Sequence, residues 1–206
     1  METALHKPQG MTPVRDGSSP ASRTGVWVLM AAITMCFVAI TSAMIVRQGA
    51  SADWQHFALP IVLYFNTVAL LASSVTLELA RRGARRDEGR GRGRPRDSRA
   101  GARRYMNWLY ATLGLAVVFL AGQCVAWEQL RGAGFYLATN PSASFFYLFT
   151  VLHAIHVAGG LAGLALVVWR VRRQTLRGGT LNAVSYYWHF LGVLWIYLLL
   201  LLWTQI

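Results

Sequence analysis

Three histidines lie inside apolar stretches of the chain, where an imidazole has few ordinary uses. His153 and His156 are three residues apart and therefore share one face of a helix, and His189 lies in the next apolar stretch. Ionisable groups inside a membrane are costly and usually functional. Imidazoles on neighbouring helices could hold a haem iron, and the helical rise predicts similar bilayer depths for His156 and His189.

A structural interpretation competes with haem ligation. Neutral histidines can form hydrogen bonds between membrane helices, each worth about 0.6–2 kcal/mol. A di-haem cytochrome would carry four histidines at a repeating spacing, and this sequence does not. We therefore predict that His153, His156 and His189 are neutral and hydrogen-bonded within or between the fourth and fifth spans. A b-type cytochrome that uses His156 and His189 stays as the alternative.

Other reactive residue types are sparse. Cys36 and Cys124 fall at different depths of their spans, so we expect no disulfide between them. The sequence has no CxxC motif and no glycine-rich phosphate loop, and no Ser-His-Asp set can be assigned. Glu78 precedes Arg81 and Arg82 by three and four residues, a spacing that predicts ion pairs on one helix. We predict no catalytic residue and no metal ligand in this chain.

The elements that carry these residues are membrane spans. The 206 residues are 55% hydrophobic and only 14% charged, which excludes an ordinary soluble domain and a disordered chain. A spanning helix needs about 20 predominantly apolar residues. We predict an all-α, polytopic membrane fold: a polar tail over 1–23, then a single membrane domain over 24–206. Its five spans are expected at about 26–46, 58–79, 106–127, 144–169 and 183–203.

The distribution of Lys and Arg predicts the orientation. An inside N-terminus places eighteen of the twenty basic residues in inside segments and leaves Arg47 and Arg131 outside, which is the bias of cytoplasmic loops. The C-terminus is then outside. Seven tryptophans fall at predicted span ends, as membrane anchors do, and Trp195 lies within the fifth span. The seven are Trp27, Trp54, Trp108, Trp127, Trp169, Trp188 and Trp203.

An arginine-rich segment over 81–104 separates the second and third spans. It holds eleven Arg, three acidic residues and five Gly, and we predict a mobile cytoplasmic loop beside an anionic leaflet. Such repeats can also bind RNA, but the segment has no aromatic residue for base stacking before Tyr105. We predict no nucleic-acid partner.

The fourth span is rich in small residues, including Gly159 and Gly163 at GxxxG spacing. Such spacing predicts close packing against another helix. No carboxylate or lysine lies in the middle of a predicted span, which argues against a pump or an ion-coupled transporter. The pattern favours an accessory membrane subunit, with a stand-alone transporter or scaffold as a further alternative.

Residues of all five spans resemble subunit III of the haem–copper oxidases, the cytochrome c oxidase subunit III family, in a short five-helix bacterial form. The resemblance covers about 23–203 and is most specific in SFFYLFTVLHAIHVAGG (144–160) and YYWHFLGVLWIYL (186–198). NTVALLASSVTLELA (66–80) and LAGQCVAW (120–127) add to it. The matching positions are Asn66, Thr67, Ser73, Ser74, Thr76, Gln123, Trp127, Thr150, His153, His156, Gly160, Trp188, His189 and Trp195.

The resemblance implies a non-catalytic subunit of an aerobic respiratory oxidase in the bacterial cytoplasmic (inner) membrane. Its implied partners are subunits I and II, which would carry the haem and copper, and its implied ligand is phospholipid. It also implies support of oxygen access and of sustained proton uptake. The electron donor of the complex stays open between cytochrome c and quinol.

The family binds phospholipid in a cleft between its first two helices and the rest. Here the resemblance points to six residues at span ends: Arg23, Trp27, Trp54, His56, Arg81 and Arg82. Two family carboxylates are missing, because Ile33 and Ala126 stand at their positions. Any role of those carboxylates is not carried over to this chain.

Overall fold

The computed structural model describes residues 20–50, 54, 56–90, 95–136, 140–173 and 178–205, with the side chains of 20–23, 87–103 and 178 left out. Within these ranges the regular secondary structure is helical. The helices are α1 (Pro20–Ala50), α2 (Val62–Arg90), α3 (Pro95–Gly132), α4 (Pro141–Arg172) and α5 (Gly178–Gln205). Each contains a segment long and apolar enough to cross a membrane, so the predicted all-α fold with five spans is confirmed.

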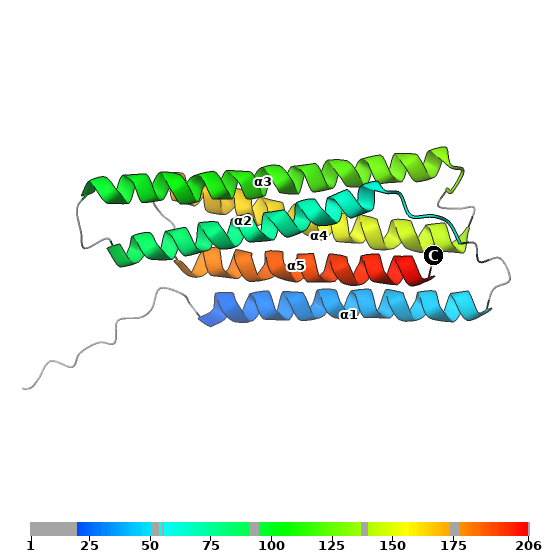
Figure 1. The fold of residues 1–206 in the computed structure, drawn as a ribbon. Helices are drawn as coiled ribbons and strands as arrows, with labels where there is room; N and C mark the ends of the chain where they lie inside the picture. The colour runs from blue at the N-terminus through cyan, green and yellow to red at the C-terminus, as the bar shows by residue number, and fades with distance from the viewer. Residues whose placement is uncertain are drawn as a thin grey trace, which may run out of the picture.

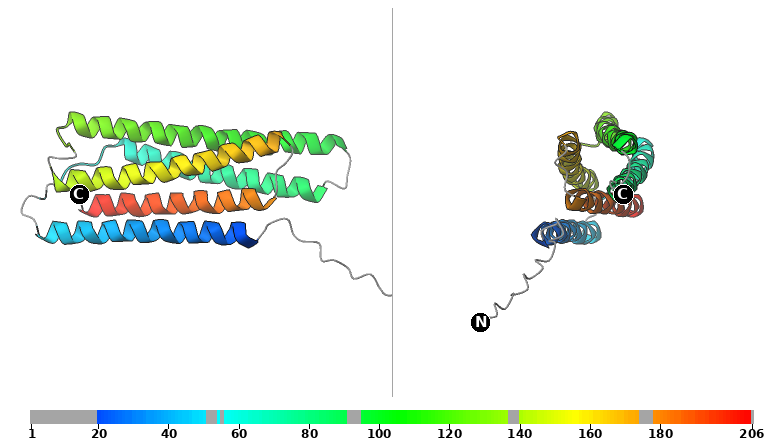
Figure 2. Two further views of the ribbon diagram at one scale, coloured as in Figure 1. Left: turned by 180° about the vertical axis from the view of Figure 1, so that it is seen from behind. Right: turned by 90° about the vertical axis from the view of Figure 1, so that its left-hand side faces the viewer.

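The helices run alternately up and down and lie nearly parallel to one another (Figure 1). Helices α2 to α5 form a closed ring, because α2 packs on α3, α3 on α4, α4 on α5 and α5 on α2. Helix α1 lies outside this ring against α4 and α5 (Figure 2). The interior of the ring is therefore the core of the protein, and α1 covers one side of it.

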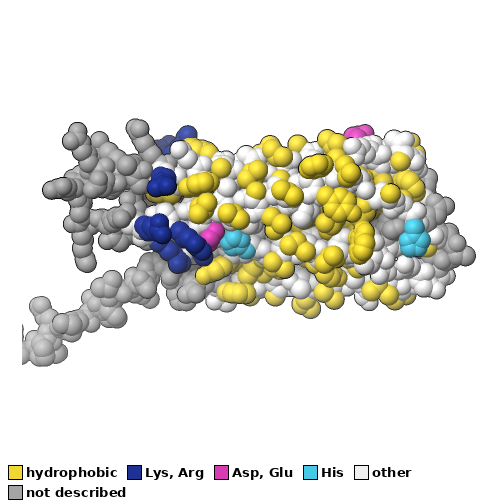
Figure 3. Space-filling model, viewed as in Figure 1, with side chains coloured by type: hydrophobic (Ala, Val, Ile, Leu, Met, Phe, Trp, Pro, Cys, Tyr) yellow, Lys and Arg dark blue, Asp and Glu magenta, His cyan; other side chains and the backbone are white. Residues whose placement is uncertain are grey.

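The surface follows the membrane prediction. On the face in Figure 3, apolar side chains form a broad band between the two ends, and arginines gather at one end. Many large apolar side chains are exposed, including Met35 at 74% and Phe65 at 70%. Such a surface suits hydrocarbon rather than water as the surrounding solvent.

The ends of the helices differ from the predicted spans in two places. The second helix begins at Val62 rather than near residue 58, since Pro60 biases the residue before it away from helical backbone. The predicted loop over 81–104 is wrong in its bounds, because α2 continues to Arg90 and α3 begins at Pro95. Arginine and alanine are good helix formers, so the helices continue beyond their apolar segments. The remaining residues 91–94 lie outside the described part.

The turn predicted after the third span is confirmed in the described residues. The amide of Gly134 donates to the carbonyl oxygen of Arg131 at 2.9 Å, and Gly134 has φ +86°, a conformation that favours glycine. Helix α4 then begins at Pro141, three residues before the predicted start, with extended backbone at Asn140. Proline suits a first helical position because its missing N–H would have no partner there.

Candidate functional site

Aromatic and polar motif residues from four helices meet in the middle of the ring. The rings of His153 (α4) and Trp195 (α5) lie 5.1 Å apart, and Phe119 of α3 packs edge-on against both. The indole of Trp195 donates to the hydroxyl of Thr67 in α2 at 2.9 Å. This layer therefore joins all four helices of the ring.

His153 is completely buried in this layer, yet neither of its ring nitrogens has a hydrogen-bond partner among the described residues. The prediction that this histidine is hydrogen-bonded within or between the fourth and fifth spans is therefore wrong. The reason is its surroundings, because the rings of Phe119 and Trp195 pack against it, and the Trp195 N–H is already bonded to Thr67.

Two amide side chains of the family motif are buried close to the same layer. Gln123 of α3 has no exposed surface, and neither its amide nitrogen nor its amide oxygen has a hydrogen-bond partner among the described residues. Asn66 of α2 lies directly against Gly122, where a Cβ would be only 2.0 Å from the Asn66 Oδ1. Gly122 thus allows α2 and α3 to approach closely at this level.

Further motif residues tie the ring together above and below this layer. The Trp127 indole donates to the Thr150 hydroxyl at 3.0 Å, and the hydroxyls of Thr76 and Thr112 lie 2.8 Å apart. These bonds join α3 to α4 and α2 to α3, respectively. Interhelical bonds of this kind stabilise membrane helix bundles.

Trp188 was predicted at the membrane interface, and this prediction is wrong. Its side chain is completely buried and donates to the Ser73 hydroxyl in α2 at 3.0 Å. Gly160 of α4 makes room for it, since a Cβ there would lie 3.1 Å from the indole ring. Gly163 faces Val184 of α5, so part of the small-residue surface of the fourth span packs within the chain.

His156 and His189 are not brought together. His156 Nδ1 lies 2.7 Å from the Leu152 carbonyl oxygen one turn earlier, and its ring packs on Phe37 of α1. His189 instead faces α2, where its Nε2 is 4.0 Å from a Glu78 oxygen. The hydrogen bond predicted for His156 is present, whereas His189 has its nearest polar contact outside the fourth and fifth spans. The two rings point to different neighbours, an arrangement that does not form an axial ligand pair.

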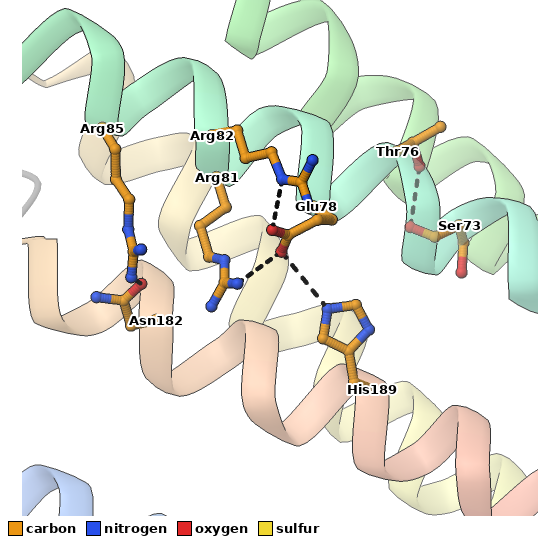
Figure 4. A network of polar contacts seen from close by, with 8 residues as sticks. All are labelled: Ser73, Thr76, Glu78, Arg81, Arg82, Arg85, Asn182 and His189. Atoms are coloured by element: carbon orange, nitrogen blue, oxygen red, sulfur yellow. Dashed lines mark hydrogen bonds and ion pairs between the residues drawn. The ribbon is translucent and has the colours of Figure 1, made fainter.

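Glu78 is the centre of a charged cluster at the arginine-rich end. Its carboxylate pairs with Arg81 at 2.8 Å and with Arg82 at 2.9 Å, as the sequence spacing predicted (Figure 4). One turn further along α2, Arg85 donates to the Asn182 side chain of α5 at 3.1 Å. The cluster thus fixes the arginine-rich end of α2 against α5. Among the described residues, no three His, Cys, Asp or Glu side chains gather in a way that could hold a metal ion.

An apolar groove of about 410 Å³ lies between the N-terminal halves of α1 and α5. One of the residues that line it, Tyr186, also carries the Arg81 guanidinium over its ring, 5.7 Å from the centroid. The groove and the charged cluster are therefore contiguous. The lining residues are Trp27, Met30, Ala31, Thr34, Tyr186 and Phe190.

The predicted cleft between the first two spans and the rest does not form in the described part of the chain. Helix α1 makes no contact with α2, because α2 is inside the ring and packs on α3 along much of its length. The groove is instead bounded by α1 and α5. Of the predicted lipid-binding residues, Trp27 lines it and Arg81 lies beside it, whereas the Arg23 side chain lies outside the described residues.

The predicted residues at the opposite end are separate from this groove. The Trp54 indole donates to the Gln205 carbonyl oxygen at 2.9 Å, and its ring packs on Phe145. His56 is exposed near the start of α2. Trp54 therefore anchors the end of α5, and its place at the membrane boundary stays a prediction.

The two positions that lack the family carboxylates are packed into the core. Ile33 of α1 is only 3% exposed and Ala126 of α3 is completely buried.

Sequence reasoning did not identify Phe119, Gly122 or the bond between the Thr41 and Tyr197 hydroxyls at 2.9 Å. The signal for Gly122 was its place next to Gln123 in the LAGQC segment, but a single glycine in a span is common.

Comparisons with known proteins identify the family of this chain. The family described as "Cytochrome c oxidase subunit III" matches residues 24–205. "Cytochrome c oxidase subunit 3" of Thermostichus vulcanus is 28% identical over 86% of this chain and 84% of its own length. The protein of the same name from a Synechocystis species is 26% identical, over 86% of this chain and 72% of its own. That from Corynebacterium diphtheriae is 30% identical over 73% of this chain and 66% of its own. The chain, a multi-pass membrane protein whose motif residues close a ring of four helices, therefore belongs to the cytochrome c oxidase subunit III family.

Proposed function

We propose that the chain is a non-catalytic accessory subunit of a bacterial aerobic haem–copper oxidase, that it packs on subunit I, and that subunits I and II are its partners. One observation carries this proposal: the tryptophans, threonines and serines of the family motif form hydrogen bonds between the helices and thereby close the ring. Their chemistry is that of a scaffold. Haem and copper then belong to the partner subunits.

The proposed location is the bacterial cytoplasmic membrane, with the arginine-rich end inside. That end holds the start of α1, the end of α2 and the end of α4 (Figure 1). Its described arginines include Arg81, Arg85 and Arg172, whereas the opposite end has Arg47 and Arg131. The positive-inside rule supports this orientation.

We further propose that a phospholipid occupies the groove between α1 and α5, with its phosphate near Arg81 and Arg82. Six largely apolar residues line the groove, which suits an acyl chain. Two guanidinium groups share the single Glu78 carboxylate, so one positive charge is left for a phosphate. The lipid would fill the space at the inner end of α1 and sustain oxygen access and proton uptake by keeping the subunit docked.

A groove-filling variant tests the lipid. Ala31→Phe places a large side chain in the groove and is expected to lower the phospholipid retained by the purified oxidase. The working life of the oxidase should shorten, while its initial rate changes little. Val118→Phe is the matched control, because Val118 is exposed on α3, which does not border the groove. An immediate loss of rate with unchanged lipid would contradict the proposal.

Co-purification tests the subunit assignment. A tagged form of this chain should bring with it a copper- and haem-bearing partner from the native membrane. A reduced-minus-oxidised spectrum of the chain isolated alone should show no haem bands. A haem spectrum from the isolated chain would instead favour a cytochrome.

A further inference from the structure

The middle of the ring holds five polar atoms that are buried and have no hydrogen-bond partner among the described residues. They are Asn66 Nδ2, Gln123 Nε2 and Oε1, and both ring nitrogens of His153. They come from α2, α3 and α4. In protein structures the large majority of buried polar atoms have a hydrogen-bond partner, so a group of unpaired ones calls for a physical explanation.

The residues one turn before and one turn after Gln123 on α3 both contact α4 at or near His153. Phe119, one turn before Gln123, touches His153, and Trp127, one turn after it, bonds to Thr150. Residues four apart share a face of a helix, so Gln123 lies between these two contacts and on the same side of α3. Its amide is therefore directed at the part of α4 that carries Thr150 and His153.

The position lies deep in the membrane. His153 is twelve residues along α4 from Pro141, which corresponds to about 18 Å at a rise of about 1.5 Å per residue. That depth is near the middle of a hydrocarbon core of about 30 Å. All three side chains are also closed off from the lipid phase, since each is at most 3% exposed. Neither lipid headgroups nor bulk water reaches these atoms, so any partner must be held inside the ring.

The chemistry of the unpaired atoms identifies the partner. The two amide nitrogens are donors, the Gln123 oxygen is an acceptor, and a neutral imidazole supplies one donor and one acceptor. A cation would find only two neutral ligand atoms, the Gln123 oxygen and one imidazole nitrogen, with no metal-binding group of His, Cys, Asp or Glu among the described residues, and an apolar molecule would leave every atom unpaired. A water molecule both donates and accepts, and buried waters typically make about three hydrogen bonds to otherwise unpaired groups.

We propose that internal water bridges Gln123 and His153 in the centre of the ring, with Asn66 Nδ2 donating to the same cluster. Water held there fixes the register of α3 against α4 and lets His153 stay neutral within an aromatic layer. The proposal concerns the interior of this chain and does not depend on the lipid groove or on the partner subunits.

A structure of the assembled oxidase, at a resolution that shows ordered solvent, tests the proposal directly. We expect a solvent peak at about 2.7–3.2 Å from both the Gln123 amide and a His153 ring nitrogen. A ring interior in which the two side chains bond directly to each other, with no solvent peak, would overturn the proposal.

Variants of the full chain in the oxidase complex provide the second test. Gln123→Leu and His153→Phe should each lower the thermal midpoint, because each leaves the other residue and its water incompletely bonded. The double variant should lower it by clearly less than the sum of the two, and the solvent peak should disappear. Thr204→Val is the control, since its exposed hydroxyl bonds, among the described residues, within its own helix at Leu200 and Leu201. Strictly additive single effects would contradict a shared water.

Discussion

The indole nitrogen of Trp188 and the hydroxyl oxygen of Ser73 lie 3.0 Å apart, and both side chains are completely buried. Ser73 in turn donates to the Leu70 carbonyl oxygen on its own helix at 2.6 Å. The bond is thus a fixed link between α2 and α5, and it joins two residues that are 115 positions apart in the sequence. Its loss should be measurable.

Ser73→Ala should destabilise the chain by about 1 kcal/mol, because it leaves the indole N–H of Trp188 without a partner inside the ring. Thermal unfolding of the purified subunit, or of the oxidase, measures the change. Ser74→Ala is the matched control, since Ser74 is only half-buried. Equal effects of the two substitutions would show that the link contributes nothing.

Gly122→Ala should be strongly destabilising. The added Cβ would lie 2.0 Å from the Asn66 Oδ1, so either the amide or the helix must move, at a cost of about 1–3 kcal/mol. Gly114→Ala on the same helix is the control, because nothing lies within 4 Å of its added Cβ. The yield of assembled subunit and its thermal midpoint should fall for the first variant only. Adding Asn66→Ala to Gly122→Ala should restore part of the loss.

Glu78→Gln should weaken the arginine-rich end of the bundle. It removes the carboxylate from Arg81, whose side chain is only 17% exposed, and we expect a loss of about 1–3 kcal/mol. Glu128→Gln is the control. The pair of Glu128 with Arg131 is 72% and 57% exposed, so its loss should cost less than about 1 kcal/mol. A loss of the same size at both positions would contradict the role of Glu78.

Protease accessibility tests the orientation. Trypsin added to inside-out vesicles should cut within 81–104, where eleven arginines lie along the end of α2, the start of α3 and the residues that join them. Right-side-out vesicles are the control and should be resistant at these sites. Cleavage confined to right-side-out vesicles would reverse the proposed orientation.

The five helices could be predicted from the sequence because length and apolar content alone determine whether a segment can span a membrane. Their arrangement could not. A membrane helix is apolar on its buried and lipid-facing sides alike, so the sequence of α5 does not show that Trp188 is buried while Trp203 is exposed. Because the sequence does not show which tryptophans are buried, the position of Trp188 near a span end predicted an interfacial anchor.

The motif residues were located by resemblance, but their contacts depend on neighbours from other helices. His153 was expected to be hydrogen-bonded because it is polar, yet the rings of Phe119 and Trp195 occupy the positions next to it. The ion pairs of Glu78 were predictable, since they depend only on the spacing of residues along one helix. Local geometry could thus be predicted from the sequence, and contacts between distant segments could not.

The place of α1 outside the ring has a consequence for biosynthesis. Helix α1 leaves the ribosome before the other four described helices, but among these it packs on α4 and α5, which follow α2 and α3 in the chain. Until then it must lie in the bilayer without its neighbours, while α2 and α3 can already pair as a hairpin. The ring can therefore close only once α5 has been synthesised, so nascent chains truncated before α5 should carry an α1 that lacks its packing surface on α5.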